Sequence, residues 1–282
     1  MRSAAPPVLR TRSRPLVTVV VVLAAVVAAM ITRSLVSGPS NAAAPRLTSA
    51  SPTVLGDIGR VTSQEENAVG LPASVTVPFS LKGESTLRIG GRPGVLYIGA
   101  EFCPYCAALR WGMVMAFDRF GVFSGLRETT SSPWDNYPNT PTFSFYGSRY
   151  ASRYLTLITV EHEGNDTHGL GTRRLLQPLT APESELWTRY DSRFGQQKSF
   201  PFLDIGNEVF VLGAPYDPGV LAGLDQSQVA ADLLRPSSPV ARDIIGAATY
   251  LTGALCLLTQ DRPVDVCAVR VVRTAAQELK IG

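Results

Sequence analysis

The spacing of apolar residues changes near residue 100. The run at 95–98 is apolar, as in a buried strand, and between residues 107 and 120 apolar residues recur every three or four positions. That second period is typical of a buried helix face, and Gly121 follows it as a C-cap. The pattern therefore predicts a strand that passes directly into a helix.

Further segments are rich in β-branched and aromatic residues, the composition of strands: residues 154–160, 202–205 and 208–212, with shorter candidates at 75–79 and 85–89. Gly206-Asn207 is a two-residue hairpin turn between two of these runs. The run at 154–160 suits a central strand beside 95–98. These strands, together with the helices, predict an α/β fold.

The C-terminal third carries helical patterns. Ser238 with Pro239 forms an N-cap and first-turn pair that opens a helix to about residue 258, and Pro263 opens a second helix to about residue 280. We expect these two helices to form an antiparallel hairpin. Residues 182–193 predict an additional helix, with Trp187 in the core.

Cys256 lies near the end of the first C-terminal helix and Cys267 near the start of the second. A helical hairpin brings such positions together, so a structural Cys256–Cys267 disulfide is expected outside the membrane. Two buried free thiols, or a relay that passes electrons to another cysteine pair, are the alternatives.

The N-terminal pattern is different, because residues 16–32 contain no charge and follow four arginines. This length is the lower limit for a spanning helix, and the arginines place the N-terminus in the cytoplasm and the remainder outside. A signal peptide cleaved near Ala42-Ala43-Ala44 is the alternative. An uncleaved signal-anchor is favoured because the apolar run exceeds the about 7–15 residues of a signal-peptide core.

The predicted organisation is that of a single-pass protein of the cell membrane. It comprises a basic cytoplasmic N-terminus (1–15), a transmembrane signal-anchor (16–36), a flexible linker (37–74) and an extracytoplasmic domain (75–282). The linker prediction comes from its Ser, Ala, Pro and Gly content. Within the domain, an insertion at about 123–150 either covers the site or packs on the far side of the sheet, and a helical extension covers about 225–282.

Net charge changes this picture little. The chain has 26 basic and 23 acidic residues, but five arginines and no acid fall within residues 1–33, which leaves 21 basic residues against 23 acidic ones in the rest. The exported part therefore has no basic excess of the kind that nucleic-acid binding requires, and no nucleic-acid partner is expected.

Cys103-Pro104-Tyr105-Cys106 stands at the predicted strand-to-helix junction. A thiolate at Cys103 would be stabilised by the helix N-terminus, so its pKa is expected to fall below the free-thiol value of about 8.5. Cys106, one turn later, can attack a mixed disulfide between Cys103 and a substrate. We therefore expect Cys103 to be an acidic, accessible nucleophile and Cys106 to resolve its adducts.

Other chemistries have weaker support. A zinc site would need a second pair of ligands at the right spacing, and the sequence has none beside Cys103 and Cys106. The two histidines, His162 and His168, are expected in a solvated loop, and no serine has a nucleophile-elbow context. No metal or organic cofactor is predicted.

At these residues the chain resembles thioredoxin-fold proteins. Ala100-Glu101-Phe102-Cys103 is similar to the approach to the active site in thioredoxins, and Pro104-Tyr105 is the dipeptide that glutaredoxins carry. More narrowly, residues 99–107, Arg110-Trp111 and 137–147 resemble a bacterial and archaeal family of membrane-anchored thioredoxin-like proteins catalogued as a domain of unknown function. The resemblance covers roughly residues 80–275.

The resemblance implies a thioredoxin-like fold with a central insertion and a C-terminal helical hairpin, preceded by one transmembrane helix. It makes Pro201 the counterpart of the cis-proline that presents backbone to the substrate. Thioredoxins have a buried aspartate where this chain has Tyr97, so Glu101 is the candidate for proton handling.

The expected activity is thiol-disulfide exchange, catalysed by Cys103 and Cys106, on cysteine-containing exported proteins, with a membrane redox partner that resets the dithiol. The alternative is a binding or scaffold domain in which Cys103 and Cys106 form only a structural disulfide. A peroxidase is less well supported, because the threonine-rich approach to a lone nucleophile is missing.

Overall fold

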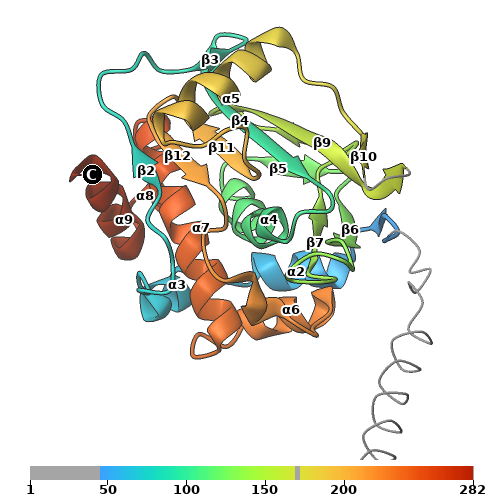
Figure 1. Ribbon diagram of the computed structural model, residues 1–282. Coiled ribbons are helices and arrows are strands. Elements are labelled where there is room, and N and C mark those ends of the chain that lie inside the picture. Colours follow the sequence, from blue (N-terminus) through green and yellow to red (C-terminus); the bar gives the residue numbers. More distant parts are fainter. Residues whose placement is uncertain (1–44, 169–171, 282) are drawn as a thin grey trace, which may run out of the picture. The chain divides into compact units, whose positions relative to one another are not determined.

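The computed structural model describes residues 45–168 and 172–281. The predicted N-terminus, the signal-anchor and the first part of the linker lie outside the described residues. The described chain has a mixed α/β fold, with several helices and mixed sheets (Figure 1).

The largest sheet has the order β10-β9-β4-β11-β12-β2, with β3 paired to β4, and its strands β4, β9, β11 and β12 were predicted. The bounds of its strands are β2 Phe79–Ser80, β3 Arg88–Ile89, β4 Arg92–Ala100, β9 Thr156–His168, β10 Thr172–Leu175, β11 Phe202–Ile205 and β12 Val209–Leu212. Of the shorter candidates at 75–79 and 85–89, only residue 79 and residues 88–89 are in strands. The strand expected beside β4 is there, because β9 runs parallel to β4 with Leu96 opposite Ile158. The sheet is mixed, since β11 pairs antiparallel with both β4 and β12.

The hairpin between β11 and β12 follows its sequence signal. Gly206 and Asn207 have φ values of 74° and 62°. A two-residue turn with both central residues at positive φ matches the right-handed twist of its strands. The predicted hairpin is therefore confirmed.

The expectation of a solvated loop at His162 and His168 is wrong. Both residues belong to β9, which continues past the end of the predicted run at Val160 and ends at His168. The cause is β10, which folds back and pairs antiparallel with β9, Thr172 opposite His168 and Leu175 opposite Glu163. Pairing with a later segment cannot be read from the local pattern.

The covering helices of this sheet are α4 (Pro104–Phe117), α5 (Ala181–Arg193) and α7 (Pro239–Leu258). Successive residues of a strand point to opposite faces. Tyr97 of β4 accordingly packs in the core built by α4 and α7, whereas Ile98 packs with Trp187 of α5. Figure 1 shows α5 on one side of the sheet and α4 with α7 on the other. Side chains of β4 thus pack on both faces of the sheet, which fixes the position where the chain passes from β4 into α4.

One helix among the described residues, α7, is long and apolar enough by composition to cross a membrane. However, 89% of its most apolar window is buried inside the protein. Close packing requires Gly253, since a Cβ there would lie 2.9 Å from the backbone nitrogen of Ala276. In this fold α7 is a central helix of the core.

Residues 45–74 correct the linker prediction. They form β1 (Thr48–Ser49), α2 (Pro52–Gly59) and α3 (Ser63–Val69). Val54 and Ile58, one helical turn apart, are buried in the core. The averaged composition of the segment concealed this short apolar stripe, which is enough to hold α2 against the domain.

The predicted insertion contains two strand pairs. Their members are β5 (Val122–Ser124) with β8 (Arg149–Ala151), and β6 (Arg127–Thr130) with β7 (Pro141–Ser144), and β1 also pairs with β6. The indole nitrogen of Trp111 in α4 donates a hydrogen bond of 2.8 Å to the carbonyl of Pro141. This buried bond ties the insertion to α4.

The C-terminal region contains η1 (Pro218–Leu221), α6 (Gln226–Leu233), α7, α8 (Val264–Cys267) and α9 (Arg270–Ile281). The first predicted helix is confirmed, with Ser238 as the N-cap and Leu258 as the last residue of α7. The second is broken into α8 and α9 immediately after Cys267.

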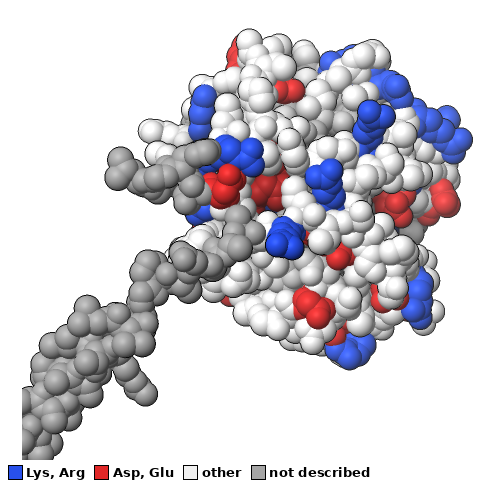
Figure 2. Space-filling view, turned by 90° about the vertical axis from the view of Figure 1, so that its right-hand side faces the viewer, with Lys and Arg blue, Asp and Glu red and all other residues white. Residues whose placement is uncertain are grey.

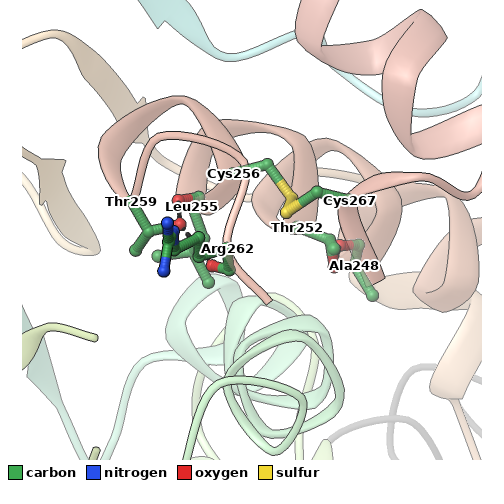
Figure 3. Close-up of a disulfide and its surroundings, with 7 residues drawn as sticks. All are labelled: Ala248, Thr252, Leu255, Cys256, Thr259, Arg262 and Cys267. Carbon is green, nitrogen blue, oxygen red and sulfur yellow. Dashed lines mark hydrogen bonds between the residues drawn. A yellow bond between two sulfur atoms is a disulfide. The ribbon is translucent and has the colours of Figure 1, made fainter. Parts of the chain in front are cut away.

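Cys256 of α7 and Cys267 of α8 are joined by a disulfide with an S–S distance of 2.05 Å (Figure 3). The turn between the two helices is also fixed by Thr259, whose hydroxyl is 2.7 Å from the Leu255 carbonyl and 2.6 Å from the Arg262 carbonyl. The disulfide thus closes a short loop at one end of the helical core.

Replacing both cysteines, Cys256→Ser with Cys267→Ser, is expected to lower the free energy of unfolding by about 2–3 kcal/mol, because the unfolded chain gains loop entropy. Urea denaturation of the oxidised wild type and of the double variant measures this difference. Equal stabilities, or two alkylatable thiols at these positions in the unreduced protein, would contradict the prediction.

Candidate dithiol site

The two cysteines of the Cys103–Cys106 motif lie where β4 ends and α4 begins. Cys103 is the N-cap of α4, and its Sγ accepts a hydrogen bond of 3.1 Å from the backbone N–H of Cys106. Pro104 occupies the first turn, where its missing N–H leaves no intrahelical bond unmade. The local sequence therefore places the first sulfur at the positive end of the helix dipole.

Both thiols are free, and both are buried. Cys103 is 4% exposed and Cys106 is 0% exposed. The partly buried side chains of Phe102, Tyr105 and Phe200 pack against them. The expectation of an accessible Cys103 sulfur is therefore wrong for this conformation, because aromatic side chains from two separate segments cover it.

The two thiols have opposite pKa shifts. Burial acts to raise the pKa of Cys103, but hydrogen bonds from Cys106 and the positive charge of Arg110 outweigh it and lower that pKa. Burial, together with the neighbouring Cys103, raises the pKa of Cys106 well above its usual range. The first thiol is thus the one that ionises, and the second keeps its proton.

A fully buried ion pair lies behind the dithiol. The Nε of Arg110 is 2.9 Å from Oε1 of Glu161, and Nη2 of the same guanidinium is 2.5 Å from Oε2. The guanidinium also donates a 2.8 Å hydrogen bond to the carbonyl of Ala100. Arg110 lies one turn after Cys106 on α4, so it links this helix to the end of β4 and to the interior of β9.

Glu101 is a second buried carboxylate in this cluster, and it is 3% exposed. One of its oxygens accepts a short hydrogen bond from the hydroxyl of Ser144 in β7. Burial and the negative charge of Glu161 raise the pKa of Glu101 to about 7. A carboxyl group that titrates near neutrality can exchange protons during thiol chemistry.

Tyr97 of β4 is fully buried and lies edge-on to Phe145, with 5.3 Å between ring centroids. Its hydroxyl is buried and has no hydrogen-bond partner among the described residues. Gly99 makes room for it, because a Cβ at that position would lie 2.0 Å from the hydroxyl oxygen. This close fit explains why position 99 of β4 is a glycine.

Pro201 begins the segment that enters β11, and the Phe200-Pro201 bond is cis. Its neighbour Phe200 packs on the cysteine cluster and lies edge-on to Phe102, with 6.3 Å between ring centroids. The guanidinium of Arg173 lies over the ring of Phe102, 4.4 Å from its centroid. The structure therefore brings Pro201 to the border of the dithiol.

The insertion contacts Phe102 and Tyr105, two of the residues that pack over the dithiol. The backbone N–H of Ser132 donates a 2.9 Å hydrogen bond to the carbonyl of Phe102, and the rings of Tyr105 and Tyr137 meet edge-on at 5.9 Å. Of the two placements that its composition allowed, the one over the dithiol is thus observed.

No role for Arg110, Glu161 or Arg173 was predicted from the sequence. The position of Arg110, four residues after Cys106 in a predicted helix, was a usable signal, because residues at this spacing share a face. Glu161 and Arg173 depend on strand pairing and had no such signal. The Cys256–Cys267 disulfide belongs to the helical core, whereas Cys103 and Cys106 form a separate cluster with Ala100.

Within the described ranges, no group of three or more His, Cys, Asp or Glu side chains is placed to hold a metal ion. On the described part of the face in Figure 2, basic and acidic side chains are interspersed over a mainly uncharged surface. The chemistry that this arrangement supports is that of the two thiols and the buried ion pair.

Replacing Arg110 and Glu161 together by glutamine is expected to raise the pKa of Cys103, because the cation that favours its thiolate is removed. The double variant is preferable to Arg110→Gln alone, which would leave Glu161 as an uncompensated buried charge at a cost of about 3–5 kcal/mol. The pH dependence of the thiolate ultraviolet absorbance measures the pKa. An unchanged value would show that Arg110 has no electrostatic effect on Cys103.

Stability is expected to fall as the pH rises from about 4.5 to about 7. The pKa of Glu101 is raised from 4.5 to about 7, so over that interval the folded protein binds more protons than the unfolded chain. Burial likewise raises the pKa of Asp204 to about 7. Glu101→Gln should flatten the dependence in urea titrations, and Asp204→Asn should remove a further part. An unaltered slope in Glu101→Gln would refute the assignment.

Comparison with known proteins gives a family but no described activity. Searches of curated proteins and of solved structures found no match to this chain. A family model described as a domain of unknown function, DUF929, matches residues 82–257. The matched range is more than half of the chain and includes Cys103, Cys106 and Pro201, but it ends before Cys267. This chain therefore belongs to the DUF929 family.

Proposed function

We propose that the protein is an extracytoplasmic thiol-disulfide oxidoreductase with a thioredoxin-like fold, which acts on cysteine-containing exported proteins. The observation that carries the proposal is the hydrogen bond from the Cys106 N–H to the Cys103 sulfur at the start of α4. Support for the fold comes from the order β9-β4-β11-β12, with the dithiol between β4 and α4 and Pro201 leading into β11.

The exchange proceeds in two displacements. The thiolate of Cys103 attacks a substrate disulfide, forms a mixed disulfide and releases one substrate sulfur as a thiolate. Cys106 then loses its proton and attacks the sulfur of Cys103, which releases the second substrate thiolate and leaves a Cys103–Cys106 disulfide. The substrate gains two electrons and the protein loses two; the reverse sequence oxidises a substrate dithiol.

The proton of Cys106 has to leave during the second displacement. Glu101 is the proposed acceptor, because its pKa of about 7 allows it to take up and release a proton near neutrality. Arg110 stabilises negative charge on either sulfur. Pro201 is proposed to present backbone to the substrate chain.

The proposed setting is the outer face of a membrane. Residues 16–36 would form the signal-anchor, with the N-terminus in the cytoplasm, and a membrane redox partner would return the dithiol to its working state. The four arginines that precede the apolar run and the disulfide between Cys256 and Cys267 support this placement.

The burial of Cys103 favours a second candidate function, a binding or scaffold domain in which Cys103 and Cys106 serve only as a structural pair. A sulfur that is 4% exposed must be uncovered before it can attack a protein disulfide. Redox titration separates the candidates, because a catalytic pair cycles with a mild reductant whereas a structural disulfide resists it.

Mixed-disulfide trapping with Cys106→Ala in the native envelope tests the enzyme proposal. We expect the full-length variant to accumulate covalent adducts through Cys103, because the residue that resolves them is missing. Non-reducing electrophoresis followed by mass spectrometry of the captured proteins gives the substrates.

The matched control is Cys103→Ser with Cys106 intact, which should trap nothing, because the attacking sulfur is absent. If Cys106→Ala captures no more protein than this control, the enzyme proposal fails and the scaffold function stands.

A further inference from the structure

A cavity of about 290 Å³ reaches Glu101 from the side of β6 and β9. Three of its buried lining residues are polar: Glu101 is 3% exposed, Thr129 5% and Asn165 7%. Water occupies about 30 Å³ per molecule in the liquid, so the cavity is larger than one ordered water requires. Apart from Glu101, the proposed proton acceptor, no residue that lines this cavity takes part in the exchange steps described above.

Two buried oxygens at this cavity lack donors. Oε1 of Glu101 accepts from Ser144, but Oε2 has no hydrogen-bond partner among the residues that the structure describes. The amide of Asn165 is oriented by two hydrogen bonds from its nitrogen, 3.3 Å to the Glu101 carbonyl and 2.8 Å to the Thr130 carbonyl. Its Oδ1 is consequently directed away from them and is also without a partner in the described chain.

The charge of the cluster is unbalanced as well. Arg110 is paired with Glu161, and Arg110 and Arg127 act on Glu101 only through their charges. Ionised Glu101 therefore adds a buried negative charge that has no ion-pair partner among the described residues. Burying an unpaired charge is costly, and a ligand that brings both positive charge and N–H donors would compensate it. Asp166 at the outer part of the cavity is already paired with Arg174, at 2.8 Å.

The outer wall is mixed. It consists of the partly buried Pro45, Leu47 and Leu176 and of the Asp166–Arg174 ion pair, whose side chains are 39% and 48% exposed. The apolar part of this entrance, above a group of acceptors, suits a ligand with a hydrocarbon stem and a cationic head. An ammonium group is compact and has three donors. These match Glu101, Asn165 and the hydroxyl oxygen of Thr129.

We propose that this cavity binds a primary alkylammonium group, with its N–H donors on Glu101 and Asn165 and its stem against the apolar part of the entrance. The group comes either from a free amine or from a lysine side chain of a partner protein. This site shares Glu101 with the proposed proton transfer, but its existence does not depend on the proposed oxidoreductase activity.

Titration calorimetry of the full-length protein in detergent tests the proposal, with n-butylammonium chloride as the probe. Saturable binding is expected, and Glu101→Gln should weaken it by at least about tenfold, because a hydrogen bond to a charged group is lost. Glu163→Gln is the matched control, since Glu163 lies on the same strand as Asn165 but does not line the cavity, and it should bind as the wild type does.

Other probes separate the ligand classes. Tetramethylammonium has the charge without N–H donors, potassium chloride supplies a bare cation, and ethylguanidinium has a planar head; weaker binding of all three supports the proposal. Equal binding of any of them, no saturable binding of n-butylammonium, or unchanged binding in Glu101→Gln would overturn it.

Two further measurements complete the test. Carbon NMR of labelled glutamate carboxyl groups in the wild type should show a shift of Glu101 on addition of n-butylammonium, and this readout does not require a folded variant. A blocked peptide that contains one lysine distinguishes the two sources: tighter binding than n-butylammonium indicates a protein-borne lysine, and weaker binding indicates a free amine.

Discussion

The buried guanidinium of Arg110 is the group on which the dithiol site depends. It contacts Glu161 within β9 and the Ala100 carbonyl at the end of β4, and its charge acts on both thiols. A cation can remain in so dry a place only when it is paired and hydrogen-bonded. The same contacts therefore hold α4 against two strands and set the electrostatic field in which Cys103 ionises.

Near this ion pair, the thiol of Cys103 has a lowered pKa and is also buried. The helix N-terminus and Arg110 favour a thiolate at Cys103, whereas Phe102, Tyr105 and Phe200 keep that sulfur nearly free of solvent. The cover is assembled from three parts of the chain: the motif itself, the segment before β11, and the insertion, which bonds to the Phe102 carbonyl through Ser132. A substrate that reaches Cys103 must displace aromatic side chains, so access to the sulfur is a property of the surrounding segments.

The cluster behind the dithiol also connects two regions of the molecule. The charges of Glu161 and Arg110 both act on the pKa of Glu101. Glu101 also lines a cavity whose wall includes Pro45 and Leu47. Residues 45–74 are thus part of the domain through β1, α2 and α3, and they contribute to the surroundings of this buried carboxylate. A change in the protonation of Glu101 would alter the charge near Arg110, and the charge of Arg110 influences the pKa values of both thiols.

The sequence by itself determined the elements whose signals are local: the strand-to-helix junction at Cys103, the Gly206-Asn207 hairpin turn, and the start of α7 at Ser238. Each depends on backbone dihedrals or capping groups within a few residues, so a short window contains the necessary information. Only the tertiary structure decided which distant side chains meet. The extension of β9 required β10 as a partner, the pairing of Arg110 with Glu161 required β9 to lie parallel to β4, and the burial of Cys103 required Phe200 to pack over it. These outcomes depend on packing between segments far apart in the chain, where the gain comes from desolvation and long-range contact that no local pattern records.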